Sequence, residues 1–119
     1  MIEDGKTDQV FQALASAARR QMLDLVRIHP GIAVGTLAES FDFTRIAVMK
    51  HLSVLESADL VISEKSGRTR KLYFNAIPIQ IIYDRWSDEY SAYWSSKLTL
   101  IKYQAESKAT NNTKETKNG

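Results

Sequence analysis

The sequence predicts a mainly α fold with a small two-stranded β-wing, a winged helix-turn-helix. Three observations within residues 44–75 support this prediction. A threonine able to cap a helix precedes apolar side chains at helical spacing. Two short strand-like stretches follow. They flank a basic Ser-Gly-Arg turn, in which Gly67 is free to take positive φ. A helix followed by a basic hairpin is the layout that places a helix in the DNA major groove and a hairpin beside it.

Three helices are predicted ahead of this segment. Apolar residues at helical spacing indicate helices over residues 8–15, 17–28 and 34–41. The sequence His29-Pro30-Gly31 ends the second helix, because proline disfavours helix in the preceding residue and glycine tolerates a left-handed turn. The third helix and the helix over 45–57 are joined by a tight connection, which predicts a helix-turn-helix.

The helix over 45–57 is the candidate recognition helix. Thr44 is its expected N-cap, and Val48, Leu52 and Leu55 define its buried face. Arginine can make a bidentate contact with guanine, and apolar side chains can touch thymine methyl groups or pack under the third helix. The candidates for DNA contact around this helix are Thr44, Arg45, Ile46, Met49, Lys50 and Ser53.

A basic hairpin, the wing over 65–71, follows the recognition helix. Its cations can enter the minor groove, bind phosphate or remain solvated. Residues 44–75 hold six basic and three acidic side chains, a net charge of +3, whereas the whole chain carries only +2. The basic excess therefore lies where DNA binding requires it. The candidate contacts outside the recognition helix are Arg68, Arg70, Lys71 and Arg20, one of two arginines that begin the second helix.

A long helix rich in aromatic residues is predicted from residue 79 to about residue 106. At 1.5 Å per residue it would span about 40 Å, longer than the core of so small a domain can cover. We interpret its apolar stripe as a dimer seam, with a pocket for a small apolar effector as the alternative. Residues 1–106 are expected to form one domain, and the polar residues 107–119 a disordered tail. The stripe contains Trp86, Tyr90, Tyr93, Trp94, Leu98 and Ile101.

Composition excludes several classes of function. There is no cysteine, so disulfides, thiolate metal sites and a cysteine nucleophile are absent. We find no phosphate-binding loop and no nucleophile–base pair, and we therefore expect neither an enzyme nor a cofactor. No signal peptide and no apolar run of about 20 residues is visible, which predicts a cytoplasmic protein without a membrane partner.

Several motifs resemble the ArsR/SmtB family of bacterial regulators. Lys50-His51-Leu52-x-x-Leu55 matches the core of that family's recognition helix, and Ala58-Asp59-Leu60-Val61 matches the link that follows it, with Asp59 in place of the usual glycine. Gly67-Arg68 and Tyr73 are similar to its wing. Ala17-Ala18-Arg19-Arg20 resembles the start of its second helix, and the aromatic residues after Trp86 resemble the last helix of a subgroup that does not bind metal.

This resemblance implies a homodimeric repressor that reads an inverted repeat in double-stranded DNA. It also implies that the first and last helices pair across the dimer axis, which adds Val10, Phe11 and Leu14 to the interface. Metal-sensing members carry cysteine or several histidines, whereas this chain has only His29 and His51, so we reject metal sensing. The alternative function is a winged-helix module that binds a protein and not DNA. The sequence names neither an operator nor a small-molecule effector.

Overall fold

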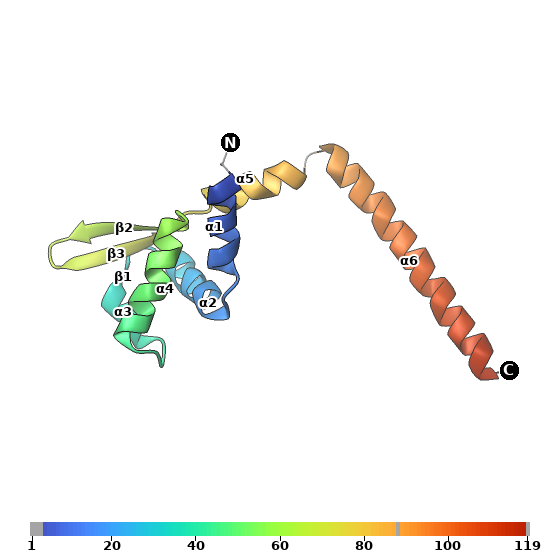
Figure 1. The fold of residues 1–119 in the computed structure, drawn as a ribbon, viewed down its shortest axis with the longest axis horizontal. Coiled ribbons are helices and arrows are strands. Elements are labelled where there is room, and N and C mark those ends of the chain that lie inside the picture. Colours follow the sequence, from blue (N-terminus) through green and yellow to red (C-terminus); the bar gives the residue numbers. More distant parts are fainter. Residues whose placement is uncertain (1–3, 88, 119) are drawn as a thin grey trace. The chain divides into compact units, whose positions relative to one another are not determined.

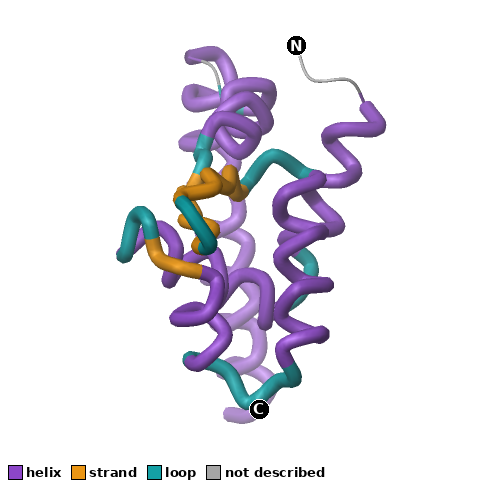
Figure 2. The backbone as a smooth tube through the Cα atoms, turned by 90° about the vertical axis from the view of Figure 1, so that its left-hand side faces the viewer, coloured by secondary structure: helices purple, strands orange, loops and turns teal. Residues whose placement is uncertain are grey.

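The computed structural model describes residues 4–87 and 89–118, and it forms two parts, residues 4–82 and 83–118. Figure 1 labels the helices and strands, and Figure 2 shows how little of the chain is strand. Helix α5 begins in the first part and ends in the second. The elements in chain order are α1 (Asp4–Leu14), α2 (Ala17–Ile28), β1 (Ile32–Ala33), α3 (Val34–Glu39), α4 (Arg45–Ser57), β2 (Val61–Ser66), β3 (Thr69–Phe74), α5 (Ile77–Trp86) and α6 (Glu89–Asn118).

The sheet has three strands, so the prediction of a two-stranded wing is wrong. The strand order is β1-β3-β2, and both pairings are antiparallel. Strand β1 has only two residues, with Ile32 opposite Leu72. Gly31 turns the chain into it at φ +85°, and its N–H donates to the Leu72 carbonyl at 2.8 Å. A strand this short is too brief to show an alternating pattern.

The first part packs around one apolar core. Helices α1, α2, α3 and α4 and the sheet all contribute to it, and its largest members are less than 2% exposed. The predicted buried face of α4 is confirmed. The buried apolar residues are Val10, Ala13, Met22, Leu23, Val26, Val34, Leu37, Val48, Leu52, Leu55, Ala58, Leu60, Val61 and Leu72.

Helix α4 ends in a Schellman motif. The Leu60 N–H donates to the Leu55 carbonyl at 3.0 Å, and the Asp59 N–H donates to the Glu56 carbonyl at 3.0 Å. This motif requires a left-handed residue at its turning point, which is usually glycine because a Cβ is strained there. Here Asp59 takes that conformation, with φ +59°. The chain thus accepts strain at the junction between α4 and the wing.

Two arginines hold the end of α1. The Arg19 guanidinium donates to the carbonyls of Ala13 at 2.9 Å and Gln12 at 2.8 Å, and that of Arg20 donates to the Leu14 carbonyl at 2.7 Å. The last carbonyls of a helix lack partners within it and carry partial negative charge. The arginines therefore stabilise the end of α1, although their charge is unfavourable at the start of α2.

The second part is helical and mostly exposed. The single helix predicted from residue 79 is two helices, because α5 ends at Trp86 and α6 begins at Glu89. Every side chain described in α6, over residues 92–109, is exposed. No helix among the described residues is long and apolar enough to cross a membrane. The α6 backbone is helical through residue 118; the domain boundary near residue 106 and the disordered tail beyond it stay predictions.

Candidate nucleic-acid interface

Helix α4 presents a mixed basic and apolar surface. The Thr44 hydroxyl accepts from the Ala47 N–H at 3.1 Å, which confirms the predicted N-cap and begins the helix at Arg45. Because the opposite side is buried in the core, the remaining side is displayed. We call this surface the α4 face, and it surrounds a hollow of about 440 Å³. The α4 face consists of Arg45, Ile46, Met49, Lys50 and Ser53.

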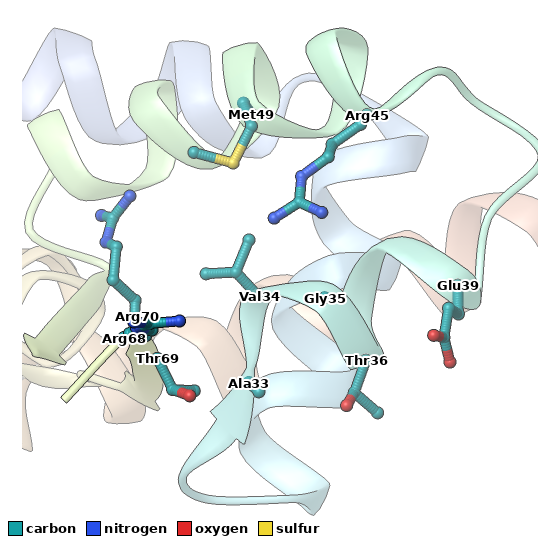
Figure 3. Close-up of a pocket in the computed structure, with 10 residues that line it drawn as sticks. All are labelled: Ala33, Val34, Gly35, Thr36, Glu39, Arg45, Met49, Arg68, Thr69 and Arg70. Carbon is teal, nitrogen blue, oxygen red and sulfur yellow. The ribbon is translucent and has the colours of Figure 1, made fainter. Parts of the chain in front are cut away.

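A second hollow, of about 450 Å³, lies between α3, α4 and the wing. Figure 3 shows Arg45 extending from α4 toward α3, whereas Glu39 points away from the hollow. Arg68 and Arg70 line it from the wing. Because Glu56 balances the charge of Arg70, the positive charge of the hollow comes from Arg45 and Arg68. A concave surface with this charge balance attracts phosphate groups. The sequence did not predict that α3 lines this hollow, because α3 has no basic side chain. The lining residues there include Val34, Gly35 and Thr36.

The wing tip is exposed. Ser66 pairs with Thr69, and Gly67 turns the chain between them at φ +63°. Glycine adopts this left-handed conformation without strain, as the sequence predicts. Arg68 at the tip and Lys71 on β3 are exposed. Both are therefore accessible to a ligand that approaches the wing.

Arg70 differs from its neighbours because it is bound within the chain. Its guanidinium forms an ion pair with the Glu56 carboxylate and donates to the Ser63 hydroxyl at 3.1 Å. The side chains of Arg70 and Glu56 are only 37% and 28% exposed. This pair links the last turn of α4 to β3. Sequence reasoning missed Glu56, since no local pattern connects residues that are 14 positions apart.

His51 lies behind the α4 face. Its Nδ1 is 3.2 Å from the Arg19 guanidinium, and its ring is 5.9 Å from the ring of Phe43. Arg19 in turn holds the end of α1. These contacts give His51 a structural role, because they join α4 to Arg19 of α2 and to Phe43.

The residues predicted at a dimer interface divide into two groups. Val10 is 1% exposed and belongs to the core, so it has no surface left for a partner. Leu14 is half-buried against the same core, whereas Phe11 is 49% exposed. The side chain of Tyr90 lies outside the described residues. The exposed aromatic and aliphatic members are Trp86, Tyr93, Trp94, Leu98 and Ile101.

The described residues do not fit a metal site. Among them, no group of three or more His, Cys, Asp or Glu side chains is arranged to hold a metal ion. The two histidines belong to different elements, since His29 is the C-cap of α2 and His51 lies within α4. We therefore derive no function that depends on a metal in this part of the chain.

Comparisons with known proteins agree with this geometry. No family model matches the chain. It is 35% identical over 89 residues to the HTH-type transcriptional regulator YuzN of Bacillus subtilis, covering 70% of this chain and 97% of that protein. It is 28% identical over 61 residues to the transcriptional repressor SdpR of B. subtilis, covering 51% and 67%. An ArsR-like transcriptional regulator from Rhodococcus sp. RHA1 superposes with a TM-score of 0.67 at 27% identity, covering 87% of this chain and 93% of the other.

Proposed function

Because the chain belongs to the ArsR family of helix-turn-helix transcriptional regulators, we propose that it is a homodimeric repressor that reads an inverted repeat. Each α4 lies in the major groove of one half-site, and each wing lies on the flanking backbone or minor groove. The observation that carries this proposal is the α4 face, a capped helix that displays basic and apolar groups beside the arginine-lined hollow.

The proposed roles of the basic residues follow from their surroundings. Arg45 is exposed at the first turn of α4, where a side chain can reach a base edge, and Lys50 and Ser53 extend along the same surface. Arg68 is exposed at the wing tip, where it can contact phosphate or the minor groove. Arg70 is reassigned: its pair with Glu56 holds the wing against α4, and this positions Arg68.

The proposed dimer rests on the exposed apolar side chains. A chain that leaves Trp94, Leu98 and Ile101 between 42% and 59% exposed has a large apolar surface to cover. A second copy with the same surface satisfies this need through twofold symmetry. A dimer that reads an inverted repeat has its two α4 helices about 34 Å apart, which is one turn of DNA. Lys71, exposed on β3, is proposed as an additional phosphate contact. Arg20 is reassigned to the end of α1, because its guanidinium donates to the Leu14 carbonyl.

The proposal is tested by fluorescence anisotropy with duplexes from the promoter upstream of its own gene. Arg45→Ala should reduce discrimination between the operator and a scrambled duplex by about 1–3 kcal/mol. Arg68→Ala should weaken binding to both duplexes alike and lower the slope of log K against log salt by about two, since each of the two wings loses one phosphate contact.

Arg27→Ala is the matched control, because it removes one exposed positive charge from α2, away from the α4 face and the wing. This variant should change neither the discrimination between the two duplexes nor the salt dependence of binding. Indifference of DNA binding to both Arg45→Ala and Arg68→Ala would contradict the proposal. DNA binding that is absent, together with capture of a protein partner, would favour the interaction-module alternative.

A further inference from the structure

The α4 face has an apolar centre. Ile46 is 70% exposed, more than any other large apolar side chain among the residues whose side chains are described. Met49 lies one turn further along, partly packed against the core. Residues three apart are neighbours on a helix surface, so these two side chains form one apolar patch. Arg45 and Lys50 border the patch.

The setting of this patch restricts what can cover it. The cores of protein–protein interfaces are depleted of charged residues, and lysine in particular is rare there. A stable interface also needs about 800 Å² from each partner. A patch of two apolar side chains between an arginine and a lysine is too small and too charged to be the core of such an interface. It matches the floor of the DNA major groove better, where hydrogen-bonding edges surround isolated methyl groups.

We propose that Ile46, with Met49 beside it, recognises the C5-methyl group of thymine, and that each operator half-site therefore carries a thymine at this position. This inference rests on the proposed DNA-binding function. Thymine is the base that presents a methyl group in the major groove, since adenine, guanine and cytosine present only polar edges there. Arg45, one residue before Ile46, selects guanine nearby in the same half-site.

The inference is tested by removing the methyl group alone. The probe is an operator duplex selected from random sequences with the full-length protein, in which each thymine is replaced in turn by uracil. The hydrogen-bonding edges stay the same. We expect one thymine position in each half-site to respond. Replacing that thymine in one half-site should lower the affinity by about fourfold, and replacing it in both half-sites should lower it by about 15-fold.

Three variants connect this effect to the side chain. Ile46→Ser should bind the thymine and uracil duplexes equally, whereas Ile46→Val should keep the preference because it keeps the apolar contact. Ile28→Ser is the matched control, since Ile28 is 56% exposed at the end of α2. It should retain the full preference. All three changes are at exposed positions, so the fold should persist, and circular dichroism checks this.

The outcomes separate this inference from the proposed function. Sequence-specific binding that is indifferent to every uracil replacement would overturn the inference and leave the repressor proposal standing. The same holds if Ile46→Ser keeps the full preference for thymine. If the protein shows no sequence-specific DNA binding, selection yields no operator, and both proposals fail together.

Discussion

The two parts of this chain differ in how far their apolar side chains are buried. In residues 4–82, the leucines and valines of the core, from four helices and the sheet, are at most 6% exposed. In α6, residues of comparable size such as Trp94 and Leu98 are 42% and 59% exposed. Both helices in question, α4 and α6, have regular helical spacing of apolar residues.

This difference shows that periodicity alone does not decide what a helix packs against. Helix α4 has partners within its own chain, because the core surrounds its apolar side. Helix α6 also has apolar residues at helical spacing, and those whose side chains are described are exposed. Since apolar surface of this extent is costly in water, we infer that its partner is a second chain. The first part thus has its own core, whereas the proposed dimer would give α6 a shared one.

The sharpest test of this contrast is the same substitution made in each part. Leu52 is 1% exposed, so Leu52→Ala should lower the free energy of unfolding by about 2–5 kcal/mol, because it leaves a cavity in the core. Leu98→Ala should change it far less at low protein concentration, where a dimer dissociates. Urea unfolding followed by circular dichroism measures both. Equal losses at every concentration would show that α6 has no separate partner.

A charge placed on the exposed side of α6 should separate the two chains. Trp94→Asp introduces a carboxylate into the proposed seam, and we expect the dimer to weaken by at least about 2 kcal/mol, roughly 30-fold. Light scattering after size exclusion should then give the mass of one chain in place of two.

Tyr103→Asp provides the matched control. Tyr103 is 67% exposed and lies nine residues from Trp94, which at 100° per residue places it on the opposite side of the helix. This variant should stay dimeric. A wild-type protein with the mass of one chain at working concentrations would end the dimer proposal.

The smallest expected effect is a gain in stability of the first part when Asp59 is replaced by glycine. Asp59 has φ +59°, so Asp59→Gly should raise the free energy of unfolding by about 0.5–1 kcal/mol. The lost contact with Lys6 costs little, because that ion pair is 3.6 Å long and both side chains are at least half exposed. Thermal and urea unfolding measure the change. Asp59→Asn should leave the free energy of unfolding nearly unchanged, because asparagine tolerates the same conformation. A clear loss of stability in Asp59→Gly would show that Asp59 is not strained.

Much of the first part could be predicted from local patterns. The N-cap at Thr44, the buried residues Val48, Leu52 and Leu55 and the left-handed turn at Gly67 are all confirmed. Each depends on side chains a few residues apart, so a short window of sequence contains the whole cause. Strand β1 was missed because its cause is the pairing of Ile32 with Leu72, 40 positions away.

The candidate site was predictable in its residue types and less so in their roles. The basic helix and hairpin follow from charge and spacing alone. Arg70 looks the same as Arg68 in the sequence, yet the fold brings Glu56 and Ser63 to it and leaves Arg68 exposed. Arg19 likewise appears as a free cation but holds the end of α1 and contacts His51.

By itself, the sequence determined the helices from α1 to α4, the cap at Thr44 and the positions of the charges, since these depend on neighbouring residues and on simple periodicity. Tertiary structure decided which arginines remain available to a ligand, which apolar faces are covered within the chain and how many strands the sheet has. The physical reason is that ion pairs, burial and strand pairing join residues far apart in sequence, and only folding brings them into contact.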